Sequence, residues 1–76
     1  MIYKLNSMDD AETLVEFCKK YKEYGNIDIS CGRYTVDGCS YLGVMSQVGN
    51  EVKVELISHD ENAVTKFNED FANVFG

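Results

Sequence analysis

Residues 36–46 read VDGCSYLGVMS, and they carry the most informative pattern in the chain. The Asp37-Gly38 pair ends a strand, because these two residue types favour turns over continued extended structure. Ser40 follows at the point where a helix would begin, since its hydroxyl can accept a hydrogen bond from a first-turn N–H group. Apolar residues then recur over one or two helical turns at Leu42, Val44 and Met45. The stretch predicts a strand end, a turn and a short helix over 40–46, which Gly43 weakens.

Upstream of this stretch, the pattern predicts a strand, a helix and a hairpin. Residues 2–5 alternate as a short strand does, with Ile2 and Lys4 on one face. The segment 7–10, Ser-Met-Asp-Asp, has the form of a helix start, and apolar residues follow it at helical spacing as far as Tyr21. Gly25 is expected to end this helix in a left-handed conformation. Residues 27–36 alternate around Gly32-Arg33, which predicts a β-hairpin.

Downstream, the pattern predicts one more strand and a final helix. Residues 52–56 alternate apolar and charged side chains, as a half-buried strand does. Residues 58–61, Ser-His-Asp-Glu, form a predicted capping box. An apolar stripe follows it at Val64, Phe67, Phe71, Val74 and Phe75. In so short a chain these aromatic rings are expected to pack in the hydrophobic core rather than to line a ligand-binding pocket.

These elements predict an α+β domain in the order β-α-β-β-α-β-α. Four strands with one apolar face need a cover, and two long amphipathic helices on the same side of an antiparallel sheet provide it. The result is an open-faced sandwich whose other face is polar, with Asp28, Ser30, Lys53 and Glu55 facing water. Because 76 residues, 45% of them hydrophobic, suffice for one core and not two, a single domain over 1–76 is expected.

The composition argues against several classes of function. Thirteen acidic residues against seven basic ones give a formal charge of −6, which disfavours a nucleic-acid partner. No apolar run approaches the roughly 20 residues that span a membrane, so a soluble cytoplasmic protein is expected. Cys18, Cys31 and Cys39 lack metal-ligand spacing and have one histidine to join them. They are expected to be reduced, packed thiols, and neither a metal nor a cofactor is predicted.

Residues 36–46 closely resemble the signature around the regulatory serine of HPr, the phosphocarrier of the bacterial sugar phosphotransferase system. Residues 11–18 are similar to the first helix of that family, and residues 51–64 to its last strand and the start of its last helix. The resemblance therefore covers nearly the whole chain, and its most specific part lies around Ser40. It implies an HPr-like fold.

The carrier segment of the family is missing from this sequence. HPr has Gly-x-His-Ala-Arg-Pro between its first strand and first helix, and the histidine relays phosphate from enzyme I to a sugar-specific enzyme IIA. Here Ser7 or Met8 stands near the histidine position, and Asp9 or Asp10 stands where an arginine is expected. A serine phosphate is too stable to be passed on readily, and two aspartates repel a phosphoryl group. The carrier function is therefore predicted to be lost.

Ser40 is the one residue for which a functional interpretation has a weight similar to that of a purely structural one. As a helix cap it is explained without any chemistry. The resemblance adds that the corresponding serine in HPr is phosphorylated by an ATP-dependent kinase as a catabolite-repression signal. A short helix cannot bury every apolar residue that follows, so part of this set should form a partner-binding surface: Tyr41, Leu42, Val44 and Met45. The implied partner is an HPr kinase-like enzyme or a transcriptional regulator.

Two readings of the function remain open at this point. The first is a regulatory protein similar in kind to the histidine-less HPr homologue Crh; the alternative is a diverged HPr-fold interaction domain that is not phosphorylated. Phosphotransferase membership with an unusual acceptor and an enzyme are both disfavoured, because no nucleophile stands beside a base. His59 is expected to be a surface loop residue, and the paired acids 9–10 and 60–61 suit first helical turns. Cys39 and Tyr41 depart from the family pattern, where a lysine and a smaller aliphatic residue are commoner.

Overall fold

The computed structural model describes residues 1–75, and its elements follow the predicted order. The strands are β1 (Ile2–Lys4), β2 (Asn26–Cys31), β3 (Tyr34–Asp37) and β4 (Glu51–Ile57). The helices are α1 (Met8–Lys19), α2 (Tyr41–Met45) and α3 (Glu61–Phe75), with a short 3₁₀ helix over Lys22–Tyr24. The β-α-β-β-α-β-α order predicted from the sequence is confirmed.

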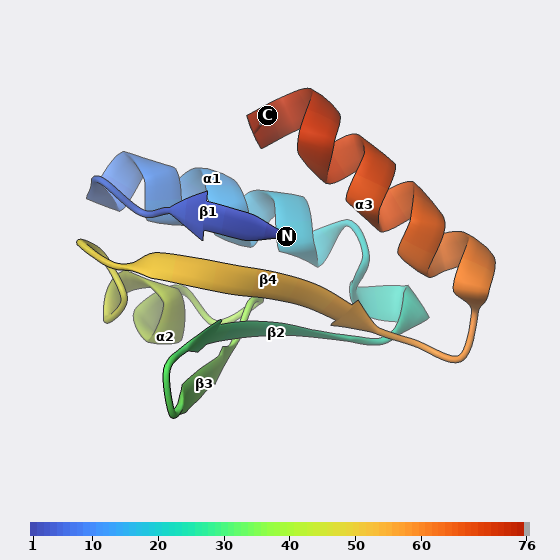
Figure 1. Cartoon of the computed structure of the whole chain (residues 1–76), viewed down its shortest axis with the longest axis horizontal. Helices are drawn as coiled ribbons and strands as arrows, with labels where there is room; N and C mark the ends of the chain where they lie inside the picture. Colours follow the sequence, from blue (N-terminus) through green and yellow to red (C-terminus); the bar gives the residue numbers. More distant parts are fainter. Residues whose placement is uncertain (76) are drawn as a thin grey trace.

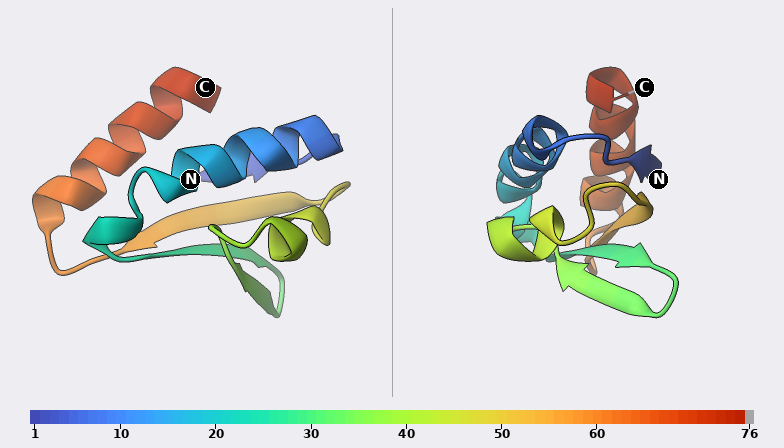
Figure 2. Two further views of the ribbon diagram at one scale, coloured as in Figure 1. Left: turned by 180° about the vertical axis from the view of Figure 1, so that it is seen from behind. Right: turned by 90° about the vertical axis from the view of Figure 1, so that its left-hand side faces the viewer.

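The four strands form one antiparallel sheet in the order β1-β4-β2-β3. The central pair places Ile29 opposite Val54, and the two neighbouring pairs place Tyr3 opposite Val52 and Ile29 opposite Val36. Helices α1 and α3 cover one face of this sheet, and α2 lies beside α1 (Figures 1 and 2). The predicted open-faced sandwich is therefore confirmed.

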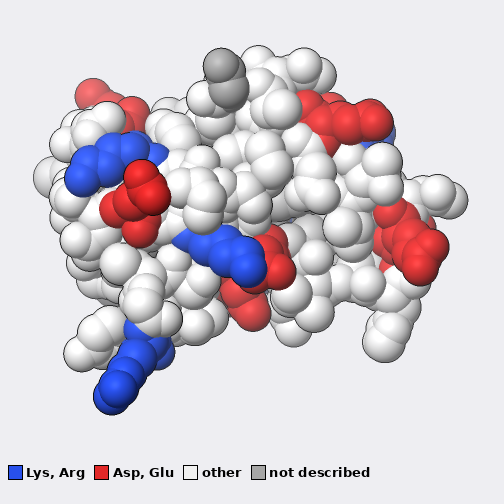
Figure 3. Space-filling model, in the orientation of Figure 1, with Lys and Arg blue, Asp and Glu red and all other residues white. Residues whose placement is uncertain are grey.

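The uncovered face of the sheet carries the polar residues expected there. Lys53 lies on β4, and its Nζ is 3.2 Å from a carboxylate oxygen of Glu55 on the same strand. Asp28 pairs with Glu55 across the strands, and Ser30 pairs with Lys53. Figure 3 shows acidic and basic side chains interspersed on the side of the molecule turned to the viewer. This arrangement is typical of a solvated sheet surface.

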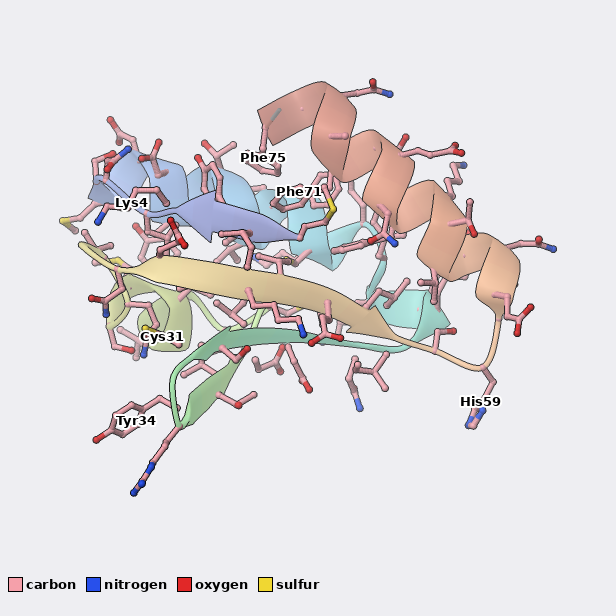
Figure 4. The ribbon with its side chains drawn as sticks, in the orientation of Figure 1. Lys4, Cys31, Tyr34, His59, Phe71 and Phe75 are labelled. Carbon is pink, nitrogen blue, oxygen red and sulfur yellow. The ribbon has the colours of Figure 1, made fainter. Side chains whose placement is uncertain are left out.

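The covered face holds a continuous core to which α1, α2 and α3 all contribute. Phe67 of α3 is fully buried, and its ring centroid lies 5.3 Å from that of Phe17 on α1 and 5.1 Å from that of Tyr21, which follows α1. Phe71 and Phe75 extend the aromatic cluster to β1, where they contact the ring of Tyr3 (Figure 4). The buried core residues are Leu5, Ala11, Leu14, Val15, Phe17, Cys18, Tyr21, Ile27, Ile29, Val44, Val52, Val54, Leu56, Ala63, Phe67 and Phe71.

At the edge of this aromatic cluster, a polar contact joins α3 to Tyr21, which lies between α1 and the 3₁₀ helix. The Tyr21 hydroxyl donates a hydrogen bond to a carboxylate oxygen of Asp70. Burial, the bond to Asp70 and the nearby charge of Asp70 together raise the pKa of Tyr21 to about 12. The hydroxyl therefore keeps its proton at neutral pH and acts as the donor.

The first helix ends differently from the prediction. Helix α1 stops at Lys19, a 3₁₀ turn follows, and Gly25 is extended rather than left-handed. Glycine is required at this position for another reason, because a Cβ on Gly25 would lie 2.1 Å from the Ile57 carbonyl oxygen. The chain crosses closely over the end of β4 here, and a left-handed stop is not needed.

The last helix also begins differently from the prediction. Asp60 caps α3 with one carboxylate oxygen, which accepts from the N–H groups of Asn62 at 3.0 Å and Ala63 at 3.2 Å. The Ser58 hydroxyl instead donates to the Tyr24 carbonyl oxygen and accepts from the N–H group of Asp60. The predicted capping box at Ser58 is thus wrong by two residues, because the Ser58 hydroxyl is hydrogen-bonded to the Tyr24 carbonyl oxygen where the two chain segments cross.

The α3 stripe is less fully buried than its spacing suggested. Val74 is 57% exposed, and Val64 and Phe75 are half-buried against the core. In the last turn of α3, the ring of Phe75 still packs against those of Tyr3 and Phe17, whereas Val74 is largely exposed to solvent. Within residues 1–75, no helix has both the length and the apolar character needed to cross a membrane.

Candidate functional site

In this chain, the β1–α1 loop supplies the residue that caps the start of α1. Ser7 is the N-cap residue of α1, and its hydroxyl oxygen accepts from the N–H group of Asp10 at 3.2 Å. The carboxylate of Asp10 in turn accepts from the N–H group of Asn6 at 3.0 Å. Met8 is 56% exposed beside them. Ser7 and Met8, which the resemblance placed near the carrier-histidine position, are therefore a capping serine and a solvent-exposed methionine, neither of which suits phosphoryl relay.

The loop between β3 and α2 positions Ser40 through a short series of local hydrogen bonds. One carboxylate oxygen of Asp37 accepts from the N–H group of Cys39 at 2.8 Å, and the Asp37 carbonyl oxygen accepts from the N–H group of Ser40 at 3.0 Å. Ser40 is exposed, and its hydroxyl oxygen accepts from the N–H group of Gly43 at 3.3 Å. Ser40 is thus the N-cap of α2, as its place in the sequence predicted.

The apolar residues of α2 divide between the surface and the core. Leu42 is 82% exposed and Tyr41 is 40% exposed, whereas Met45 is half-buried. Val44 is fully buried among the core residues. A partner cannot reach Val44 in the folded domain, which corrects the sequence-based assignment of that residue to the partner-binding surface. We define the α2 surface as Tyr41, Leu42 and the exposed part of Met45.

The start of α2 lies against the C-terminal half of α1. A Cβ built on Gly38 would be 3.0 Å from the Cys18 sulfur and 2.9 Å from a methyl carbon of Ile27. Burial, followed by the neighbouring Cys39 and Asp37, raises the pKa of the Cys18 thiol to about 12. This thiol is therefore a packing group at neutral pH, in agreement with the sequence-based expectation.

The pKa of the Cys39 thiol depends on both burial and nearby charges. Burial and the carboxylate of Asp37 raise the pKa of this thiol, whereas the positive charges of Lys22 and Lys19 act in the opposite direction. The neighbouring charges thus act in opposite directions on the thiol next to Ser40.

His59 lies far from the β1–α1 loop. It is exposed in the turn between β4 and α3, at the opposite end of the molecule from Lys4, which stands near the start of α1 (Figure 4). The helices and strands thus separate the sequence's one histidine from the β1–α1 loop. Asp60 caps α3, and Glu61 lies in its first turn. The acidic pair at this point is explained by helix capping and the helix dipole.

Replacing the cap should cost more stability than replacing the adjacent histidine. Asp60→Ala is expected to lower the free energy of unfolding by about 1 kcal/mol, because two N–H groups of α3 lose their acceptor. His59→Ala should change it by less than about 0.5 kcal/mol, because the side chain is exposed. Urea denaturation of both variants measures the difference. An equal loss from the two substitutions would contradict the assignment of the cap to Asp60.

A groove of about 420 Å³ lies between α1 and α3, and it was not predicted. Phe17 and Val74 supply its apolar floor, and Lys20 stands at one end. Three acidic residues of α1 also line the groove: Asp9, Glu12 and Glu16. Within residues 1–75, no group of three or more histidine, cysteine, aspartate or glutamate side chains is arranged to bind a metal ion.

One of three comparisons with known proteins identifies the fold. A scan against protein-family models and a search of curated proteins both gave no match. A search of solved structures found the crystal structure of HPr-C-His from Thermoanaerobacter tengcongensis, with a TM-score of 0.67 and 21% sequence identity. The match covers 96% of this chain and 89% of the other. At this identity the likeness concerns the fold, since one fold serves many functions. The chain thus has an HPr-like fold.

Proposed function

We propose that this chain is a regulatory HPr-like protein that lacks the phosphocarrier histidine and acts through phosphorylation of Ser40 and binding to another protein. The observation that carries the proposal is the juxtaposition at the start of α2: an exposed serine followed directly by the exposed side chains of Tyr41 and Leu42. A phosphate on Ser40 would change the charge at the edge of the α2 surface without entering the core.

The β1–α1 loop supports the loss of the carrier role. Relay between proteins needs a group that accepts phosphate and releases it readily, and histidine does so because its phosphoramidate is labile. Ser7 is occupied as a helix cap, and the aspartates at 9 and 10 place negative charge where an incoming phosphoryl group would approach. His59 is at the other end of the domain (Figure 4).

The exposure of Leu42 supports a protein partner. A leucine that is 82% exposed beside a half-exposed tyrosine is an apolar feature that protein partners commonly cover. Phosphorylation would add about −2 charge next to these residues. Such a charge favours a partner that presents an arginine and penalises one that binds through apolar contact alone. The modification would thereby act as a switch on the α2 surface.

Phosphoryl donors distinguish the proposal from its alternatives. With ATP and the HPr kinase of the source organism, the wild-type protein should gain one phosphate, Ser40→Ala none, and the matched control Ser46→Ala, at the other end of α2, one. With phosphoenolpyruvate and enzyme I, no acid-labile phosphate should appear. Intact-protein mass spectrometry measures the phosphate that each protein gains in each reaction. The absence of phosphate on wild type in the kinase arm would favour an unphosphorylated interaction domain, and acid-labile phosphate in the enzyme I arm would restore a carrier.

A further inference from the structure

We infer that the groove between α1 and α3 binds a basic amphipathic segment of another protein. The apolar side of that segment lies on Phe17 and Val74, and its lysine or arginine side chains face the acidic residues of α1. The inference goes beyond the proposed function because it concerns a second surface. Helix α1 lies between this groove and α2, with α3 on its other side (Figure 2). Binding in the groove therefore does not depend on phosphorylation of Ser40.

The folded domain leaves an apolar surface open along the groove. Phe17 belongs to the core and lines the groove from α1, whereas Val74 lines it from α3 and is 57% exposed. The aliphatic stems of the charged lining residues add to this surface. A second hollow of about 320 Å³ shares Phe17, Lys20 and Val74 with the first and extends past Tyr21 and Tyr24. The two hollows thus form one extended groove, which is the shape that accepts the apolar face of an amphipathic helix.

The charges along the groove differ between its two ends. The charged residues that line the first hollow are Asp9, Glu12, Glu16 and Lys20. The three acidic residues follow one another at intervals of three and four, so they share one face of α1. The charged residues that line the second hollow are Lys20, Lys66 and Asp70. The part of the groove beside the N-terminal half of α1 is therefore the part that attracts a cation.

Helix stability explains only part of this acidic face. Asp9 lies in the first turn of α1, where a negative charge is favoured by the helix dipole. Glu12 and Glu16 lie beyond that turn, where the effect of the dipole has fallen off. Glu16 is 3.6 Å from the ammonium group of Lys19, in an exposed pair that is only weakly stabilising. Both glutamates can therefore pair with basic side chains of a bound segment at little cost to α1.

The combination of an apolar surface and an acidic face selects the occupant. An acidic or purely polar segment would leave the carboxylates or the apolar surface without a complement. A second copy of this chain carries the same formal charge of −6, so charge repulsion opposes its approach to the acidic face. The same net charge attracts a basic segment. The complementary ligand is thus a helix that is apolar along one face and basic at one end.

The experiment titrates the ¹⁵N-labelled full chain with a synthetic amphipathic peptide that has leucines along one face and lysines at one end. Two-dimensional NMR at low salt is expected to show shifts at the amides of Glu12, Glu16 and Val74. A comparison peptide with glutamates in place of the lysines should bind about tenfold more weakly. A second comparison peptide with alanines in place of the leucines should also bind about tenfold more weakly, because it lacks the apolar face.

Variants of the chain test each part of the groove separately. Glu12→Gln with Glu16→Gln should weaken binding of the leucine–lysine peptide about fivefold, and Val74→Ala about threefold. Lys20→Gln should strengthen it about twofold, because it removes a like charge from the groove. The matched control, Glu51→Gln with Glu55→Gln, removes the same charge from the uncovered sheet strand β4 and should bind as wild type does.

Equal weakening by the β4 control and the α1 double variant would overturn the inference, since binding would then follow net charge alone. Shifts centred on Tyr41 and Leu42 would place the peptide on the α2 surface and overturn it as well. Concentration-dependent shifts at Val74 without peptide would assign the groove to a second copy of this chain. Failure of a kinase to modify Ser40 would remove the proposed function and leave this titration unaffected, so the two failures are distinguishable.

Discussion

Phe67→Ala is expected to lower the free energy of unfolding by about 4 kcal/mol, the loss usual for deleting a buried aromatic ring. Phe67 is fully buried where α3 meets α1, and its ring lies within 5.3 Å of those of Phe17 and Tyr21. The substitution leaves a cavity that helix–helix packing cannot close without moving α3 off the sheet. Because a domain of this size has a net stability of only about 5 kcal/mol, the variant should be largely unfolded near room temperature in mild urea.

The same helix offers a matched control for this experiment. Val74 is 57% exposed, so Val74→Ala should change stability by less than about 0.5 kcal/mol. Phe67→Leu keeps most of the buried volume and should fall between the two variants. Urea denaturation followed by circular dichroism gives all three values. A loss below about 1 kcal/mol for Phe67→Ala would show that the α1–α3 aromatic cluster is not the main source of stability.

The second large effect is expected for Gly25→Ala, at about 3 kcal/mol of lost stability, because a methyl group here must displace backbone. Its Cβ would lie 2.1 Å from the Ile57 carbonyl oxygen and 3.1 Å from the Cβ of Ser58. The adjacent residue, Asn26, pairs with Ile57 in the sheet, so the clash falls at the start of the β2–β4 ladder. Relief requires moving the end of β4 or fraying that ladder.

Gly32→Ala separates this steric effect from the general cost of replacing a glycine. Gly32 has a φ of 59° in the hairpin turn, and no atom lies within 4 Å of where a Cβ would be. Its substitution should therefore cost only the backbone strain of about 1 kcal/mol. Thermal and urea unfolding of both variants provide the test. A cost for Gly25→Ala no greater than that of Gly32→Ala would mean that the crossing between Gly25 and Ile57 relaxes easily.

Sequence patterns predicted the elements whose structure depends on near neighbours in the chain. Alternation over 52–56 predicted β4, and the first-turn serine predicted the cap of α1, whose hydrogen bond spans three residues. The spacing of Phe67 and Phe71 predicted the buried stripe of α3. In each case the relevant hydrogen bond or face is determined within one element, so composition and period are sufficient evidence.

Patterns failed where a second segment of chain competes for the same residue. Ser58 was predicted to cap α3, but its hydroxyl bonds to Tyr24, and Asp60 provides the cap. Gly25 was predicted as a left-handed stop, but the approach of Ile57 explains the glycine. Val44 was predicted at a binding surface, but it is fully buried. Each outcome depends on a contact between distant parts of the sequence, which local spacing does not encode.

The amino-acid sequence alone was enough to predict that Ser40 begins a short helix and that apolar residues follow it, and it shows no histidine between the first strand and the first helix. These features depend on residue identity and on hydrogen bonds between near neighbours. The folded structure was needed to show that Leu42 is exposed while Val44 is buried, and that Lys20 lines the groove between α1 and α3. The physical reason is that burial and charge proximity are properties of packed surfaces, and the packing of α2 against α1 joins residues about 20 positions apart in the chain.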